Sequence, residues 1–507
     1  MTAFSGDRRI AARLALVAAL AYLPFSHCHF SASDETGVYD TARSILFDGD
    51  PAIEPGKHIF RGPDGRHYSH FAVGQSLLAL PLVAAGEALG ALLPEAWGQR
   101  LWGRTAEGAI IDTREEPGIF AASLWAPAVT GLLVGLFFAF ERRLGASRGA
   151  SLAAAVALGA GSYVAAHSVF FLRHTSEGLA VLASLYGLLV FRQTGRVGWL
   201  ALGTACAAAL VLIRVPAAVA GPGLAAYLAF VLWERWRAGR LPAPARVVAA
   251  ALGPPFLLAA LHLASNRLRW GHWIASPMLE QSFLLQGDLL AGLYGLLLSP
   301  GAGMFVYTPL LLLLPATAPG FWRAHRAEAL AVLGVSAGLL WMCGSFHFWH
   351  GLWSAPGPRY LFALVALWML PLGLWLDAAR GPVRWRVAGV LAALGAGVQL
   401  ALILPTWRRA VELAGYQAEI QHWGFLYEPL RGPIVACARA VAAGEIDVWL
   451  WALAMGVPGR PAQPWLAALL LLVWAGLFAW AVARLRAAWA QGEGGGEGAS
   501  GAGASST

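Results

Sequence analysis

Long blocks of apolar residues alternate with short polar segments along almost the whole chain. Examples are Ala11–Phe25, Gly118–Phe140 and Trp465–Val482. A helix needs about 17 to 25 predominantly apolar residues to cross the hydrocarbon of a bilayer. The pattern therefore predicts an all-α polytopic membrane protein. The predicted crossings cover residues 9–26, 119–140, 150–168, 176–192, 198–214, 215–233, 246–264, 303–319, 328–345, 360–378, 385–404 and 464–486.

A further apolar stretch, Phe71–Leu93, is ambiguous because it contains Gln75, Pro81 and Glu87. The positions of the arginines decide its interpretation, since basic residues favour cytoplasmic loops. If this stretch does not cross, all the arginine clusters between the apolar blocks fall on one side of the membrane. We therefore predict about 12 crossings with both termini cytoplasmic. Phe71–Leu93 then becomes a juxtamembrane or re-entrant helix on the outer side.

The composition agrees with a membrane protein. Of the 507 residues, 58% are hydrophobic and only 13% are charged, and the mean hydropathy is +0.60. A soluble domain carries about a quarter charged residues, so this chain lacks the material for a water-facing surface. The net charge of +8 is spread over short clusters between the apolar blocks, which argues against a nucleic-acid-binding face. No C-x-x-C pair indicates metal or redox work, and a disulfide between Cys28 and Cys437 is left open.

The predicted organisation is one transmembrane domain over residues 1–490, followed by a tail. The tail, residues 491–507, is almost only Gly, Ser, Ala and Glu, which predicts disorder. The largest outer segments are a first loop with juxtamembrane helices, residues 27–118, and a later segment, residues 405–463. The chain shows no repeat of fixed period, and its long first loop argues against two matching inverted halves.

Polar groups gather at the predicted outer ends of the helices. Asp34 and Glu35 follow the first helix, where a carboxylate sheltered by apolar walls can act as a general base. Two solvated loop acids are the alternative. His70 heads the apolar stretch 71–93 and would present a polar group to a lipid headgroup. The alternative for this stretch is an interfacial helix with snorkelling ends.

Three arginines are candidates for binding a phosphate. Arg173 lies beside His174 in a short outer turn, where the alternative role is to cap the next helix. Arg214 interrupts an apolar stretch and either binds an anion at the outer edge or snorkels to water. Arg359 and Tyr360 end a segment rich in Gly, Pro and aromatic residues. A guanidinium there can neutralise a phosphate, although interfacial anchoring also explains many of the aromatic residues.

Together these segments resemble the GT-C superfamily of membrane glycosyltransferases. This superfamily includes protein O-mannosyltransferases, lipid A aminoarabinose transferases and bacterial enzymes that use polyprenyl-phosphate sugars. Asp34-Glu35 matches the acidic pair that follows the family's first helix. His70–Gln75 is similar to the element that heads the family's juxtamembrane helix, but lacks its two prolines. Gly295–Gly303 and Gly351–Tyr360 look like runs of an uncharacterised bacterial branch.

The resemblance implies an inverting transfer of sugar from a polyprenyl-phosphate donor to a glycan, lipid or protein acceptor, at the outer face of the cytoplasmic (inner) membrane. It implies Asp34 as the general base, with Glu35 beside it at the catalytic position. Cations are expected to meet the charge that develops on the leaving phosphate. The residues expected to bind the donor phosphate or position the substrates are Arg359, Arg214, Arg173, His174, His70 and Tyr360. The resemblance to the mannosyltransferase branch implies no cofactor and no metal.

Two other functions stay open. A polymerase or ligase of lipid-linked glycans would share the outer-face site but use a diphosphate donor. A transporter or flippase would place charged residues near the helix midpoints and would have two related halves. The midpoints are almost all Ala, Leu, Val and Gly, which favours the enzyme. We expect the choice of acceptor to lie in the outer segment 405–463.

Overall fold

The computed structural model describes residues 3–94, 97, 101, 117–277, 285–351, 355–379, 381–405, 407–413, 424–456 and 461–497. The fold is 77% helical, and the sheet in its described part is a two-stranded hairpin. By length and composition, nine described helices could cross a membrane. The number is ten if the bent pair Arg148–Gly161 and Tyr163–Val169 is one span. The predicted class, an all-α polytopic membrane protein, is confirmed.

Each predicted crossing corresponds to helical structure. The longer helices are α1 (Ala3–Tyr22), α6 (Trp125–Leu144), α7 (Arg148–Gly161), α9 (Arg173–Thr194), α10 (Val197–Ile213), α11 (Gly221–Arg237), α12 (Pro244–Trp270), α17 (Arg326–Gly344), α20 (Val383–Ile403) and α24 (Pro464–Glu497). With the bent pair counted, three of the 12 predicted crossings are not spans by this criterion: α1 carries several charges in its first half, α10 has only 17 residues, and residues 303–319 form short helices. The nine spans include Gly74–Leu92, which is not among the 12. Residues 498–507 of the predicted tail lie outside the described residues, and residues 491–497 belong to α24.

Two predicted crossings are broken at prolines. Residues 303–319 form α15 (Met304–Tyr307), a 3-10 turn (Pro309–Leu313) and α16 (Leu314–Ala324). Residues 360–378 form α18 (Phe362–Met369) and α19 (Pro371–Asp377). Proline lacks the N–H that continues a helical ladder, and its ring clashes with the preceding turn. Both breaks therefore follow directly from the sequence.

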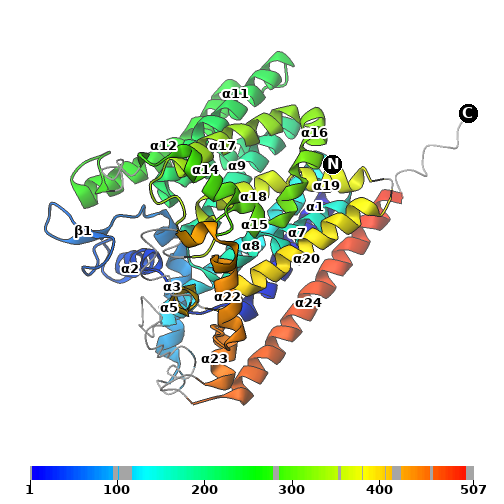
Figure 1. Ribbon diagram of the computed structural model, residues 1–507. Coiled ribbons are helices and arrows are strands. Elements are labelled where there is room, and N and C mark those ends of the chain that lie inside the picture. The colour runs from blue at the N-terminus through cyan, green and yellow to red at the C-terminus, as the bar shows by residue number, and fades with distance from the viewer. Residues whose placement is uncertain are drawn as a thin grey trace, which may run out of the picture.

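The two ends of the helical bundle differ in structure (Figure 1). The start of α1 and the end of α24, the described segments nearest the termini, lie at one end. There, Asp7 pairs with Arg142 and Arg148 at 3.0 and 2.8 Å, and Arg192 contacts Glu234 and Glu328, each at 2.6 Å. At the other end lie α2 (Ser33–Phe47), β1 (Ile59–Arg61), β2 (His67–Ser69), α3 (Gly74–Leu92), α5 (Pro117–Ser123), α22 (Pro433–Ala442) and α23 (Trp449–Met455).

The hairpin of β1 and β2 is antiparallel, with Phe60 opposite Tyr68. Arg269, near the end of α12, donates to the carbonyls of Ser69 and Phe71 at 2.9 and 2.7 Å. These bonds fasten the hairpin and the start of α3 to the bundle. The hairpin is thereby fixed over the end of the bundle that lies away from the termini.

Helix α3 corresponds to the predicted non-crossing stretch. A side chain at Gly74 would overlap the carbonyl oxygen of Leu212 at the end of α10, and one at Gly86 would overlap that of Pro117 in α5. Only glycine allows backbones to approach this closely. Helix α3 satisfies the length and composition of a span, so its juxtamembrane path stays a prediction.

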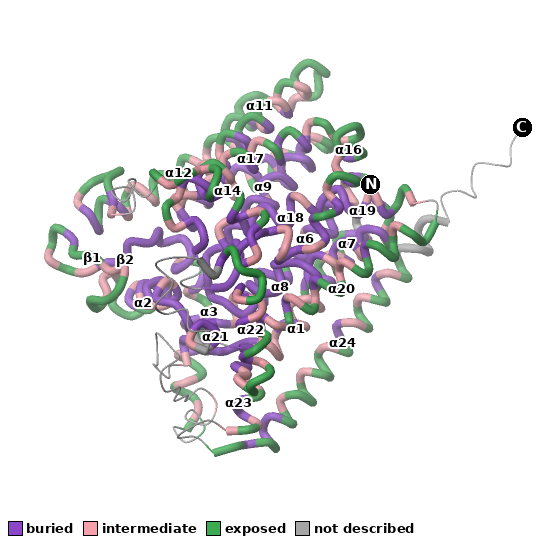
Figure 2. The backbone as a smooth tube through the Cα atoms, viewed as in Figure 1, coloured by how far each residue is buried: buried purple, intermediate pink, exposed green. Residues whose placement is uncertain are grey.

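Apolar side chains form a core through the centre of the bundle and also cover much of its outside. Figure 2 shows the buried centre and the exposed runs along α12 and α24. On α12, Leu252, Phe256 and Leu257 are 63, 72 and 67% exposed. Apolar exposure of this extent is expected where side chains face lipid. The four cysteines are free thiols, so the open Cys28–Cys437 disulfide is not formed.

Candidate functional site

Asp34 lies between two arginines from distant parts of the chain. It is the second residue of α2, and its Oδ2 lies 3.5 Å from Arg173 Nη2 and 3.5 Å from Arg359 Nη1. Arg173 begins α9, and Arg359 precedes α18. The Asp34 side chain is only 12% exposed, and the two arginine side chains are 7 and 5% exposed. Three candidates named from the sequence thus meet in one sheltered cluster.

The electrostatics of this cluster keep Asp34 ionised. Burial acts to raise the pKa of Asp34, but the charges of Arg359 and Arg173 lower it, with smaller effects from His58 and His70. The net result is a pKa below the ordinary value for aspartate. The site therefore holds a carboxylate anion at neutral pH, which is the form that accepts a proton.

Only part of the Arg359 guanidinium makes hydrogen bonds within the described chain. Its Nη2 donates to the hydroxyl of Tyr360 at 3.4 Å, whereas its Nε and Nη1 are buried and have no hydrogen-bond partner among the described residues. Leaving buried donors unpaired costs about 1–3 kcal/mol each. An anionic ligand would remove that cost, because a guanidinium can bind a phosphate through two parallel N–H groups. Gly351, at φ +61°, keeps this position open, since a Cβ there would lie 2.9 Å from Arg359 Nε.

Arg214 and Tyr360 complete the basic cluster. Arg214 Nη1 donates to both carboxylate oxygens of Glu177, at 3.1 and 3.3 Å. The ring of Tyr360 contacts both Arg214 and Arg359, with each guanidinium carbon 5.0 Å from the ring centre. Three guanidinium groups thus face two carboxylates, Asp34 and Glu177. The cluster has one positive charge in excess, which favours binding of an anion.

Arg173 links the cluster to the start of α3. Its guanidinium carbon lies 3.8 Å above the ring of Phe71, a cation–π contact at close range. In the next turn, Gln75 of α3 accepts a hydrogen bond from Ser176 of α9 at 2.6 Å. These contacts place the first turn of α3 directly beside Asp34 and its arginines.

The two candidate histidines, His70 and His174, lie around this cluster and make no hydrogen bonds through their ring nitrogens within the described chain. These nitrogens are buried. His174 packs against Tyr360, with ring centres 5.7 Å apart. His70 stacks between His58 and Phe60, at 5.1 and 5.5 Å. Burial, together with the charges of His58 and Arg173, lowers the pKa of His70 to about 3, so its ring is neutral.

Glu35 does not face the arginines. Its carboxylate accepts the backbone N–H groups of Ser31 and Ala32, each at 2.9 Å, and that of Phe171 at 2.6 Å. The first two bonds close the start of α2, and the third ties it to the segment that enters α9. Glu35 thus positions Asp34 by fixing two segments of the site, and its oxygens do not point at the basic cluster.

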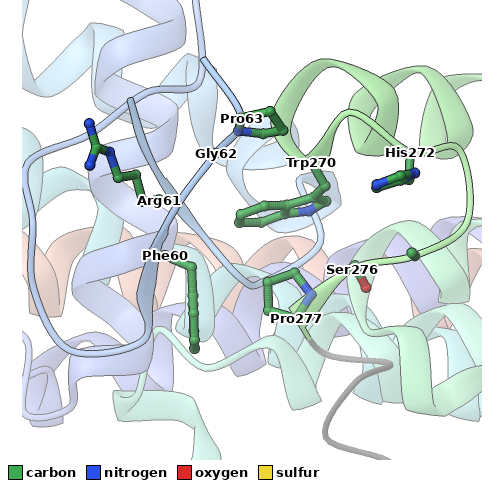
Figure 3. A pocket seen from close by; sticks show the side chains of 9 residues that line it. Phe60, Arg61, Gly62, Pro63, Trp270, His272, Ser276 and Pro277 are labelled. Carbon is green, nitrogen blue, oxygen red and sulfur yellow. The ribbon is translucent and has the colours of Figure 1, made fainter. Parts of the chain in front are cut away.

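A pocket of about 430 Å³ lies beside the hairpin (Figure 3). The sequence alone did not indicate it. Aromatic rings from β1 and from the end of α12 face each other across it. Because Phe60 also stacks on His70, the pocket adjoins the site of Asp34. Its lining residues are Phe60, Arg61, Gly62, Pro63, Trp270, His272, Ala275, Ser276 and Pro277.

No protein-family model and no curated protein matches this chain. Among solved structures, the fold is similar to that of ArnT from Cupriavidus metallidurans bound to undecaprenyl phosphate. The TM-score is 0.46 at 16% identity, over 87% of this chain and 76% of ArnT. The chain is also similar to the S. cerevisiae protein O-mannosyltransferase Pmt1-Pmt2 complex bound to the sugar donor. That comparison gives a TM-score of 0.35 at 13% identity, over 52% of this chain and 33% of the other.

A third similar structure is the Archaeoglobus fulgidus oligosaccharyltransferase in the apo form. Its TM-score is 0.43 at 11% identity, over 85% of this chain and 60% of the other. These neighbours are glycosyltransferases of the GT-C superfamily, the group that the sequence resembles. Likeness at this level concerns the fold alone. The side chains of the site carry the functional proposal below.

Proposed function

We propose that this chain transfers a sugar from a polyprenyl-phosphate donor to an acceptor at the outer face of the cytoplasmic membrane. The proposal depends on one observation: an ionised carboxylate lies beside a guanidinium that has N–H groups without a hydrogen-bond acceptor. Asp34 Oδ2 lies 3.5 Å from Arg359 Nη1. Neither Nη1 nor the buried Nε of Arg359 makes a hydrogen bond within the described chain. A proton acceptor and an anion-binding group thus lie side by side.

The proposed reaction uses both groups. Asp34 removes the proton from the acceptor hydroxyl as its oxygen attacks the anomeric carbon. The bond between that carbon and the phosphate oxygen breaks on the opposite face, which inverts the configuration. The polyprenyl phosphate leaves with one more negative charge than the donor carried. Arg359 and Arg173 meet this charge, and the excess positive charge of the cluster stabilises it further.

The surroundings of the cluster suit a lipid-linked donor. Helix α3 begins beside Arg173 and then exposes Leu78, Leu89 and Leu92, which are 44, 42 and 82% exposed. An apolar helix that starts at an anion-binding cluster suits a ligand with a charged head and a hydrocarbon tail. His174 and Tyr360 would position the donor, and His70 would lie on the side of the pocket.

The pocket beside the hairpin is the proposed place for the acceptor. Its walls include Phe60 and Trp270, and aromatic rings suit the apolar faces of sugar rings. The outer segment 405–463 stays the second candidate for acceptor choice. It is described in α21 (Trp407–Leu413), α22 and α23, while residues 414–423 and 457–460 of it lie outside the described part.

The first step of this proposal can be measured as binding. The purified full chain in lipid nanodiscs is titrated with undecaprenyl phosphate and followed by native mass spectrometry. We expect binding by the wild type, a loss of at least tenfold in Arg359→Gln, and no change in Arg196→Gln. Arg196 is an exposed arginine of the turn between α9 and α10. Equal binding by all three proteins would contradict the role of Arg359.

Transfer itself is tested in cells. Mass spectrometry of surface glycans and glycolipids, with and without the gene, should show one species that lacks a sugar when the gene is absent. A plasmid copy of the wild type should restore that species, whereas Asp34→Asn should not. An unchanged glycan and glycolipid profile after deletion would sink the transferase proposal.

A further inference from the structure

A second cluster of chemically active side chains lies apart from the arginines. His27 and His29 follow the end of α1, and Asp447 immediately precedes the residue that caps α23. One candidate ligand atom from each of the three lies within 4.8 Å of the other two. All three residues are buried, at 1, 8 and 4% exposure. This cluster could not be predicted from the sequence, because 418 positions separate His29 from Asp447.

The hydrogen bonds of the two imidazoles orient them toward the carboxylate. The Nε2 of His27 lies 2.8 Å from the carbonyl oxygen of Ile403, and the Nδ1 of His29 lies 3.2 Å from that of Phe30. A carbonyl only accepts, so the imidazole nitrogen that bonds to it is the protonated one in that tautomer. In a neutral imidazole the lone pair then sits on the other nitrogen. Metal-ligating histidines typically donate their second N–H to a backbone carbonyl in this way.

The remaining nitrogen of His29 faces the carboxylate directly. Its Nε2 lies 2.9 and 3.1 Å from the two oxygens of Asp447. With its proton on Nε2, His29 donates to this carboxylate. With its proton on Nδ1, the lone pair of Nε2 faces the carboxylate, and a cation between them would remove the repulsion. A second proton on His29 would supply one cation. A metal ion would supply another, and it alone would also use the lone pair of a second imidazole.

We propose that His27, His29 and Asp447 bind a divalent zinc-class ion. Two imidazoles and one carboxylate are a donor set that suits zinc, with a fourth position left for water. Bonds of about 2.0–2.1 Å in a tetrahedral site set the ligand atoms about 3.3–3.4 Å apart. The spacing of the cluster, from 2.9 Å up to 4.8 Å, brackets that value. From the sequence we expect no metal, so this site departs from that expectation.

The ion would join two segments that already touch. The N–H of Trp449 donates to the carbonyl of Ser26 at 3.0 Å, and the N–H of Asp447 donates to that of Leu404 at 2.7 Å. A bound ion would lock the segment 26–32, which leads directly into α2 and Asp34. Its role would be to hold this entry in place, so the site is separate from the chemistry at Asp34.

The test is metal binding by the full chain, purified in detergent with a tag that lacks histidine. The protein is stripped with a chelator, dialysed against zinc and measured by inductively coupled plasma mass spectrometry. We expect about one zinc per wild-type chain and at least a tenfold loss in His29→Gln and in Asp447→Asn. The matched control is His325→Gln, in the turn between α16 and α17, which should keep the wild-type content.

X-ray absorption of the zinc-loaded wild type gives a second measurement that needs no variant. The proposal expects two imidazoles in the first shell and only nitrogen or oxygen ligands. Amide exchange in the segment 26–32 should also slow when zinc is added. A stripped wild type that takes up no zinc, or takes up as much as Asp447→Asn, would overturn the proposal. In that case His29 and Asp447 are joined by a direct hydrogen bond.

Discussion

At the scale of single residues, Asp34 is the group on which the proposed chemistry depends. Asp34→Asn keeps the shape of the side chain but removes its ability to accept a proton. We expect the transfer rate to fall by about 10²–10⁴, the usual contribution of a general base. Binding of undecaprenyl phosphate should be unchanged or tighter, since the variant removes a negative charge 3.5 Å from Arg359.

The control for this variant is Asp48→Asn, at the exposed C-terminal end of the same helix. Radiolabelled sugar transfer and native mass spectrometry, run on both variants, separate catalysis from donor binding. If Asp34→Asn lost donor binding and sugar transfer to the same extent, Asp34 would act on the donor and not as a base.

The pKa of Asp34 makes a prediction about pH. A lowered pKa means that the carboxylate loses its charge only when the pH falls below the ordinary range for aspartate. The acid limb of kcat/KM, which reports the free enzyme, should therefore lie at lower pH than an ordinary aspartate would give. In Arg359→Gln the largest lowering influence is gone, so the limb should move to higher pH. Rates measured from pH 3 to 8 for both proteins check the shift. Acid limbs at the same pH in the wild type and in Arg359→Gln would contradict it.

Glu35 makes a separate prediction about stability. Burial raises the pKa of Glu35 to about 7, against the backbone N–H groups of Ser31, Phe171 and Ala32, which lower it. A raised pKa in an acid favours the protonated form in the folded chain. The stability that protonated Glu35 contributes to the folded chain is fully present below about pH 4.5, and it is lost as the pH rises through 7. The difference in melting temperature between wild type and Glu35→Gln should therefore change between pH 5 and 8, as thermal unfolding can show. A difference in melting temperature that stays constant from pH 5 to 8 would contradict a raised pKa of Glu35.

At the scale of elements, the packing of α3 on α10 is set by one glycine. Gly74→Ala should separate α3 from α10, because its methyl group would overlap the carbonyl oxygen of Leu212. We expect a lower melting temperature and weaker transfer, since the first turn of α3 lies beside Arg173. Gly198→Ala in α10 is the control, since a Cβ there meets nothing within 4 Å. Alanine favours helix by up to about 1 kcal/mol over glycine, so this control should be neutral or slightly stabilising.

Most elements could be predicted from the sequence because the bilayer imposes their length and their apolar character. The predicted ranges correspond to helices, and the breaks at Pro309 and Pro371 could have been predicted from the same sequence. The resemblance also named Asp34, Arg173 and Arg359, which the structure brings together. Each of these signals is local in the sequence.

Non-local geometry could not be predicted. Successive residues of a helix point about 100° apart, so only one member of Asp34-Glu35 can face the arginines. The sequence does not say which, because that depends on where α2 begins and on the contact with Phe171. The pocket at Trp270 and the cluster of His27, His29 and Asp447 likewise join segments from distant parts of the chain.

At the scale of the whole molecule, the two ends of the bundle carry different chemistry. The end with the termini holds ion pairs among residues of the basic clusters, which suits a cytoplasmic face. The opposite end holds the arginine cluster, the pocket and the hairpin (Figure 1). Gathering of the candidate site at one end fits an enzyme working at one membrane face better than a transporter, which needs a path open to both faces.

The last prediction tests this topology and the path of α3 together. Lys57 lies exposed before α3, and Arg240 lies exposed between α11 and α12. If α3 does not cross, five crossings separate these residues and they lie on opposite faces. If α3 crosses, the number is six and they share a face.

Lys57→Cys should therefore react with a membrane-impermeant maleimide in intact spheroplasts, whereas Arg240→Cys should react only after lysis. Three of the native cysteines are buried and Cys206 is half-buried, so the wild type supplies the background. Labelling of both variants in intact spheroplasts would make α3 a true span and would move the arginine clusters beyond it to the outer face.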